Sequence, residues 1–162
     1  MPLVYNSQLA QVTTAANTGV APNTEIDCWA AKPGTRNIGI QAMYVGGKGA
    51  GLTALSGISY RIKKWGTGTS TGTAITPVAR DPGAQAAKFS AFASNSAVPT
   101  PGTGGPTFLG GCISGAAGPG GWVAPNPDSL MTLEGSTTSS MDLFVHSGTA
   151  SLLFEANMEV VE

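Results

Sequence analysis

The sequence predicts an all-β protein: an antiparallel β-sandwich that is jelly-roll-like and has an extended N-terminal arm. Three observations support this fold class. Charged residues make up only 10% of the chain, whereas helices in water carry charged outer faces. Apolar and polar residues alternate with a period of two in short segments, spaced at intervals of about ten residues. Between these segments lie most of the 23 glycines and 11 prolines, which are the residues that favour turns.

The N-terminal segment contains no charged residue and is predicted to be an arm over residues 1–22, ahead of one sandwich domain over residues 23–162. Leu3, Val4 and Tyr5 form a small apolar cluster in it. Such an arm can lie on a neighbouring subunit as an added strand. The alternative, left open by the sequence, is that this segment is the first strand of its own domain.

Ten segments after the arm have the composition or alternation of strands, and most of them show hydrophobic residues on one face. In RNIGIQAMYVGG, one face is expected to carry Ile38, Ile40, Ala42 and Tyr44. In LTALSGISYRIKKW, one face is expected to carry Ile58, Tyr60 and Ile62, and the other Ser59, Arg61 and Lys63. The predicted strands lie within residues 25–31, 36–47, 52–65, 73–80, 86–94, 106–115, 120–125, 129–135, 140–147 and 150–162.

GTGTSTGT, residues 66–73, follows the basic strand end at once. It lacks the spacing of a phosphate-binding loop, and no helix-forming segment follows it. A strand pattern resumes at Ile75, and Pro77 marks an edge strand or the start of a strand. The run is therefore predicted to be the tip of a hairpin.

The last two strands are predicted to form a closing hairpin around Ser147-Gly148-Thr149. In the second of them the even-numbered residues are all apolar, which predicts that they face the core. These residues are Leu152, Phe154, Ala156, Met158 and Val160.

Charge is divided unevenly along the chain. All eight basic residues lie between Lys32 and Lys88, and six of the nine acidic residues follow Lys88. The two halves can pair internally across strands, or they can form two surface poles that meet between subunits. There is no basic excess to indicate nucleic-acid binding, and no apolar run approaches the ~20 residues of a membrane span. No nucleic-acid or membrane partner is expected.

The residues that carry catalysis are sparse. His146 is the only histidine, so neither a Ser/His/Asp triad nor a histidine-rich zinc site can be assembled around it. Cys28 and Cys112 are far apart in sequence and are expected to be small buried residues, with a disulfide between them as the alternative. We expect no enzyme activity, no cofactor and no metal.

Tryptophan is common at interface hot spots, and each tryptophan here lies at the margin of a strand or loop. Core-edge packing is the competing interpretation for all of them. The residues expected to contact another subunit or partner are Leu3, Val4, Tyr5, Arg61, Lys63, Lys64, Trp65 and Trp122.

The stretch GISYRIKKWGTGTSTGTAITPVARDPGAQAAKFSA resembles a pattern found in structural proteins of tailed bacteriophages. The shared features are a strand, a Gly/Thr/Ser turn, Thr76-Pro77-Val78 and Asp81-Pro82, with the acidic strand LLFEANMEVVE at the chain end. The resemblance covers residues 52–162 and implies a head decoration, or cement, protein. It implies no catalytic residues.

The resemblance predicts a homotrimer that binds the major capsid protein and bridges capsid subunits on the surface of the virion. The chain has no signal-peptide pattern, so we expect it to be made in the host cytoplasm. The alternative function is a receptor- or glycan-binding β-sandwich module of a phage tail fibre.

Overall fold

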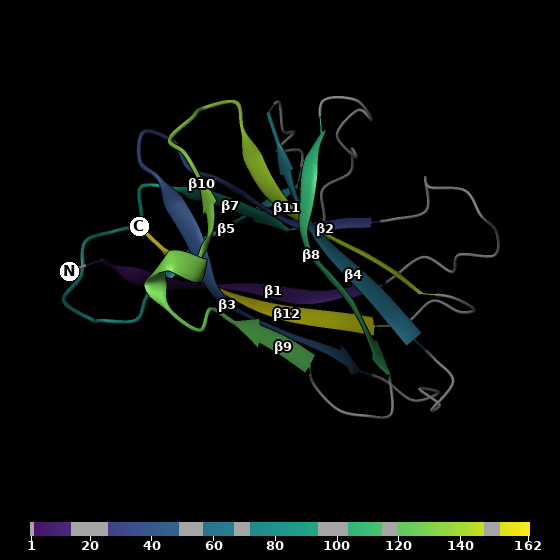
Figure 1. Ribbon diagram of the computed structural model, residues 1–162. Helices are drawn as coiled ribbons and strands as arrows, with labels where there is room; N and C mark the ends of the chain where they lie inside the picture. Colours follow the sequence, from purple (N-terminus) through teal and green to yellow (C-terminus); the bar gives the residue numbers. More distant parts are fainter. Residues whose placement is uncertain are drawn as a thin grey trace.

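The computed structural model describes residues 2–13, 26–48, 57–66, 72–93, 104–114, 120–147 and 153–162. These residues form two antiparallel sheets packed face to face, so the predicted β-sandwich is confirmed (Figure 1). Within the described residues the helical content is a 3-10 turn at Pro127–Ser129.

Sheet A follows the order β10-β3-β12-β1-β6, and β9 also pairs with β3. Its strands are β1 (Val4–Thr13), β3 (Ile38–Lys48), β6 (Val78–Ala79), β9 (Gly120–Val123), β10 (Met131–Leu133) and β12 (Leu153–Val161).

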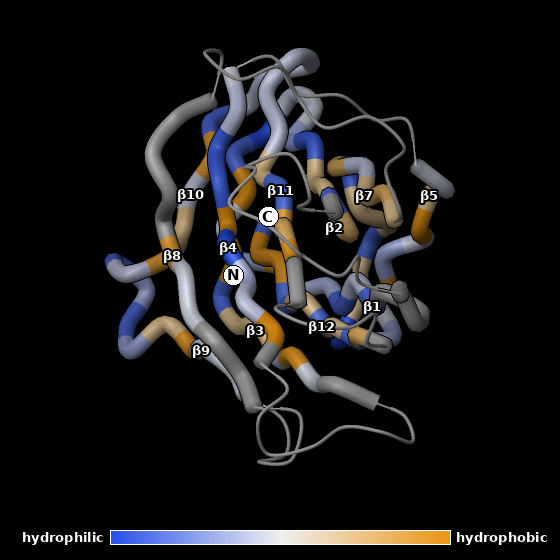
Figure 2. Tube along the Cα trace, turned by 90° about the vertical axis from the view of Figure 1, so that its right-hand side faces the viewer, coloured by the Kyte–Doolittle hydropathy of each residue, from blue (hydrophilic) through white to orange (hydrophobic). Residues whose placement is uncertain are grey.

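Sheet B follows the order β5-β7-β2-β11-β4-β8, and Figure 2 shows these strands side by side with β8 and β5 at the two margins. Its strands are β2 (Ile26–Lys32), β4 (Gly57–Trp65), β5 (Thr73–Ile75), β7 (Ser90–Ala93), β8 (Gly104–Ser114) and β11 (Ser140–Ser147).

The connectivity is jelly-roll-like. The first four strands alternate between the sheets, and the orders β10-β3-β12-β1 and β2-β11-β4-β8 are those of a jelly roll. The segment between β4 and β8 adds β5 and β7 to the margin of sheet B and β6 to the margin of sheet A. Pro77 lies where the chain passes from β5 in one sheet to β6 in the other, which agrees with a strand start at that position.

A tryptophan joins the two sheets inside the core. Trp29 of β2 is fully buried, and its indole Nε1 donates a 2.9 Å hydrogen bond to the hydroxyl oxygen of Ser7 in β1, which is also buried. A buried indole N–H needs such an acceptor, because leaving it without one costs free energy. Ser7 supplies this acceptor from the opposite layer.

The core face predicted for the last strand is confirmed over its described part. Phe154, Ala156, Met158 and Val160 are all at most 3% exposed. The alternate positions Glu155, Asn157, Glu159 and Val161 are half-buried and face outward. Leu152 lies outside the described residues.

Residues 4–13, predicted as part of an arm, form a strand inside the sandwich. β1 pairs with β12 along its length and with β6 on its other side. Backbone hydrogen bonds between Leu3 and Glu162, with N–O distances of 3.2 and 3.0 Å, bring the chain ends together. These residues follow the alternative interpretation: they form a strand of the protein's own domain. Residues 14–22 of the predicted arm lie outside the described residues.

Both predicted hairpins are wrong. β4 and β5 lie in the same sheet but are separated by β11, β2 and β7, so GTGTSTGT connects distant strands. β11 and β12 lie in different sheets, so they do not pair with each other as a hairpin. Small polar residues suit a long connection as well as a tight turn, and the alternation within a strand carries no information about which strand is its partner.

A β-bulge makes the predicted face of β3 wrong beyond Ile40. Glu159 pairs with Ala42 and Val160 with Ile40, so Gln41 is an extra residue in β3. An extra residue inverts the alternation beyond it. Ile38 and Ile40 therefore face the core as predicted, but Met43 and Val45 follow them inward, and Tyr44 turns outward and is 45% exposed.

Deleting residues 1–13 is expected to abolish cooperative unfolding, because it removes a central strand and exposes the edge of β12. The measurement is urea denaturation followed by circular dichroism, with deletion of Met1 and Pro2 alone as the control. A folded, cooperatively unfolding deletion variant would show that β1 is dispensable to the sandwich.

Substituting Ser7→Ala should lower the free energy of unfolding by about 1–3 kcal/mol, because the Trp29 indole N–H loses its acceptor in the core. Chemical denaturation measures the change. Ser90→Ala, at an exposed position of β7, is the matched control and should change stability by less than about 0.5 kcal/mol. Equal effects of the two substitutions would contradict the role assigned to Ser7.

Candidate functional site

The N-terminal residues predicted as contacts are largely buried within the sandwich. Leu3 and Val4 are half-buried, and Tyr5 is fully buried. The Tyr5 hydroxyl donates to the backbone oxygen of Gln85 at 3.0 Å, and its ring packs edge-on against Phe89 with centroids 5.7 Å apart. Burial raises the pKa of the Tyr5 phenol, and the nearby Glu162 carboxylate raises it further. Tyr5 therefore stabilises the sandwich and has no exposed surface for a partner.

The basic strand end is split between the two sides of sheet B. Arg61, Lys63 and Trp65 share the outer side, whereas Lys64 lies opposite Met141 on the inner side. The Trp65 side chain is only 5% exposed, and its ring lies 5.9 Å from that of Phe144. Trp65 is therefore a packing residue, and the three basic residues are half-buried.

Lys63 is held over two aromatic rings on this outer side. Its Nζ lies 5.4 Å from the centroid of Phe144 and 5.8 Å from that of Trp65, within the range of cation–π attraction. Trp122 of β9, the remaining predicted contact, is half-buried and packs against the core. The structure therefore does not bring the predicted contact residues together on one surface.

A buried carboxylate lies beside Lys63. Asp142 of β11 is opposite Lys63 in the register and is fully buried. Its two carboxylate oxygens, the hydroxyl oxygen of Ser140 and the indole nitrogen of Trp65 have no hydrogen-bond partner among the described residues. Burial raises the pKa of Asp142 to about 7, against the opposing influence of the positive charge of Lys32. This group of polar side chains is unfavourable to the fold when Asp142 is ionised.

The other residues considered for chemistry do not form a reactive site in the described part of the chain. Cys28 is a free, buried thiol that donates to the backbone oxygen of Leu143 at 3.1 Å, and burial raises its pKa. The disulfide alternative is therefore wrong, and the prediction of a small buried residue is confirmed for Cys28. The backbone of Cys112 pairs with Ser59, and that of His146 also pairs with Ser59 from the other side. Their side chains lie outside the described set.

The uneven charge distribution leads to at least one internal ion pair. Arg80, from the basic half of the sequence, lies 3.6 Å from the carboxylate of Glu159 in the acidic half. The strand order places β6 and β12 on either side of β1. Internal pairing across strands is thus present in the sandwich.

The outer face of sheet A carries the large exposed hydrophobic residues of the described chain. One row across the sheet runs Val78, Asn6, Glu159, Ala42 and Val123, and the next runs Gln8, Asn157, Tyr44 and Gly121. Val78 is 63% exposed, Val123 53% and Tyr44 45%. We call these two rows the outer face of sheet A. Exposed apolar side chains grouped with polar ones indicate a surface that binds a ligand or partner.

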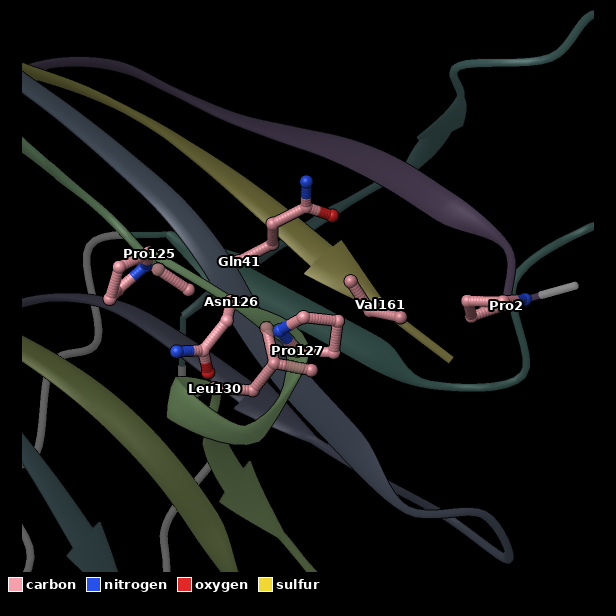
Figure 3. A pocket seen from close by; sticks show the side chains of 8 residues that line it. Pro2, Gln41, Pro125, Asn126, Pro127, Leu130 and Val161 are labelled. Carbon is pink, nitrogen blue, oxygen red and sulfur yellow. The ribbon is translucent and has the colours of Figure 1, made fainter.

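Two hollows open on this side of the molecule. The larger, of about 300 Å³, lies where the Pro125–Pro127 loop passes the bulge residue Gln41 and the two chain ends. Figure 3 shows that Pro2, Val161 and Leu130 contribute its apolar wall. The smaller, of about 200 Å³, lies between β1, β3 and β12. Its lining residues are Gln8, Tyr44, Val45, Gly46, Glu155, Ala156 and Asn157.

A second candidate surface is the β8 margin of sheet B, which has no further strand beside it in the described part of the chain. In the described pairings β8 is hydrogen-bonded only to β4, and it spans the eleven residues Gly104–Ser114. The other strands at the sheet margins are β5, β6, β9 and β10, which have three, two, four and three residues. β8 contains no charged residue. Natural proteins usually keep edge strands short or place charges on them, so a long uncharged edge indicates an interaction surface.

Neither candidate surface was found from the sequence. Tyr44 was assigned to the core face because the bulge at Gln41 has no distinct signal in the sequence. β8 was predicted as a strand within residues 106–115, but its position at the margin depends on the order of all the strands. The absence of Lys, Arg, Asp and Glu from residues 104–114 was the available signal.

Comparison with protein-family models, with curated proteins and with solved structures finds no match for this chain. Among the described residues, no three or more His, Cys, Asp or Glu side chains are grouped as a metal site would require. Nor does any helix in the described ranges have the length and apolar character to cross a membrane.

The raised pKa of Asp142 predicts that stability falls as pH rises. The carboxyl is protonated in the folded protein up to about pH 7, whereas in the unfolded chain it ionises near pH ~4. Its contribution is therefore fully present below about pH 4 and is lost as pH rises through about 7. Between pH 5 and 8 the wild-type protein should lose about 2–3 kcal/mol relative to Asp142→Asn, which cannot ionise.

Urea denaturation of both proteins across this pH range measures the difference. Asp128→Asn, at an exposed position, is the matched control and should run parallel to the wild type. A wild-type protein that gains stability relative to Asp142→Asn above pH 7 would contradict the raised pKa.

Proposed function

We propose that this protein is a structural component of a tailed-bacteriophage virion: a decoration protein that binds the major capsid protein and braces the head surface as a homotrimer. The resemblance of residues 52–162 to structural proteins of tailed bacteriophages supports a capsid protein as the partner. The long uncharged edge of β8 is the structural observation that carries an assembly role. The role needs no cofactor and no catalytic residue.

The pairing of β8 supports its use as an edge for another chain. Residues 109–114 pair without interruption with residues 57–62 of β4, and register shifts occur only toward the other end of the strand. An edge strand presents unpaired backbone N–H and C=O groups, to which an extended segment of another chain can add. Backbone pairing of this kind gives affinity, and repeated contacts in a symmetric shell multiply it.

Two consecutive glycines, Gly110 and Gly111, lie in the part of β8 that pairs without interruption with β4. Gly111 lies opposite Tyr60, and a Cβ atom at Gly111 would come within 2.6 Å of the Tyr60 hydroxyl oxygen. The tyrosine ring therefore occupies the space that a side chain would need. Gly110 beside it is exposed. The absence of a side chain at Gly110 allows another backbone to approach closely there.

The test is co-sedimentation of the purified protein with empty phage heads. Gly110→Lys places a charge at the edge and should weaken binding at least tenfold, which is about 1.4 kcal/mol. Gly110→Ala is the matched control, because it removes the glycine without adding charge and should bind nearly as the wild type does. Thermal unfolding of both variants checks that each is folded.

Stoichiometric binding that Gly110→Lys weakens would support the proposal. Absence of binding to heads, or equal binding by the two variants, would contradict it. Light scattering of the native protein should give the mass of a trimer, and a monomer at micromolar concentration would remove the trimer from the proposal.

A further inference from the structure

Sheet A also contains a long strand that is covered along only part of one side. β1 pairs with β12 from Val4 to Thr13, but on its other side β6 reaches only Val4, Tyr5 and Asn6. In the described pairings, residues 7–13 of β1 therefore have no strand on that side. We propose that β8 of one copy pairs with residues 7–13 of β1 in the next copy, and that repetition of this contact closes the homotrimer.

These are the two longest uncovered strand stretches of the described chain. β8 has eleven residues, and residues 7–13 read SQLAQVT. The remaining strands at the sheet margins have at most four residues. Neither stretch contains Lys, Arg, Asp or Glu, so their pairing buries no unpaired charge from either strand. Since a long run of backbone hydrogen bonds needs two long edges, β1 of a second copy is the best-matched partner for β8 within this chain.

The two edges lie on opposite sides of the sandwich. β8 is the margin of sheet B that lies by β3, whereas β1 lies by β5 and β7 near the other margin of sheet B. Figure 2 shows β8 on the left and β1 toward β5 on the right. Edges placed in this way cannot pair within one copy. They can pair between copies, with each copy using β8 toward one neighbour and β1 toward the other.

The symmetry of a trimer requires a contact of this kind. In a ring of three, each subunit presents one surface to one neighbour and a different surface to the other, whereas a surface that pairs with itself gives a two-fold dimer. β8 paired with β8 would leave no edge for a third copy. This inference rests on the proposed function for the trimer, and it supplies the second surface that β8 alone lacks.

An irregularity in β1 limits the strength of each single contact. The register with β12 shifts between Leu9 and Val12, so residues 10 and 11 form a bulge. Bulges on an edge strand oppose unlimited strand addition. Closing the ring adds a third contact between subunits that are already joined, and this intramolecular step strengthens the assembly beyond any one contact. We therefore expect closed trimers in equilibrium with monomers, with few dimers and no filaments.

The test is the mass of the full chain in solution without phage heads, measured by light scattering and analytical ultracentrifugation. Gln8 is an exposed residue of β1, and Gln8→Lys places a charge on the proposed stretch. Gln8→Lys and Gly110→Lys should each raise the dissociation constant of the trimer at least tenfold. Thr132→Lys adds the same charge at an exposed position of the margin strand β10 and should leave the trimer intact. Thermal unfolding checks that each variant is folded.

Cross-linking shows which edges meet. In a Cys112→Ser background, Gln8→Cys and Gly110→Cys each place one reactive thiol at one edge, and the buried thiol of Cys28 does not compete. A bismaleimide that reaches about 10 Å spans two strand spacings. It should convert the double variant to covalent trimers and leave each single-cysteine variant without cross-links.

Three results would overturn this inference: a trimer that Gln8→Lys leaves intact, Gly110→Cys cross-linked to itself as a dimer, or a wild-type protein that is a monomer at micromolar concentration. Head binding is measured separately by co-sedimentation. Binding to heads by a trimer that Gln8→Lys leaves intact would contradict the β1 contact and leave the proposed function standing. A trimer that passes both tests but does not bind heads would contradict the proposed function and leave the β1 contact standing.

Discussion

The hydrogen bond between Trp29 and Ser7 is the interaction on which the two-layer arrangement depends. The largest fully buried side chain of the core comes from β2 in sheet B, and its only polar atom is satisfied by β1 in sheet A. β1 must therefore lie across from β2 in the opposite sheet. With β1 in this place, Tyr5 reaches Gln85 and Phe89, and the first residues pair with the last. The N-terminal segment thus becomes part of the core.

The jelly-roll-like connectivity then determines which side chains and strand edges each sheet exposes. Sheet A has an outer face of exposed hydrophobic and amide side chains, whereas the outer side of sheet B buries Asp142, Ser140 and Trp65. The margins also differ, because β5, β6, β9 and β10 are short and β8 is long. The long uncharged edge and the two hollows therefore lie on different sheets.

The sequence predicted most strands well, and it failed where pairing or an irregularity decided the outcome. The even-numbered face of β12 was correct because an uninterrupted strand keeps its alternation, and Phe154 to Val160 face the core as expected. In β3 the alternation was correct up to Ile40 and inverted beyond the extra residue Gln41. The basic cluster was predicted to be exposed, but Trp65 packs against Phe144, since a strand in the middle of a sheet is covered by neighbours that its own sequence does not reveal.

The sequence by itself determined the class of fold, because low charge, period-two alternation and frequent glycine and proline are local properties that exclude a helical protein. It also determined which face of β12 is buried. Only the tertiary structure decided that β1 belongs to the sandwich, that GTGTSTGT joins distant strands, and that Tyr44 and β8 lie at the surface. The physical reason is that strand partners are chosen by contacts between residues far apart in sequence, and one extra residue such as Gln41 inverts every side chain beyond it.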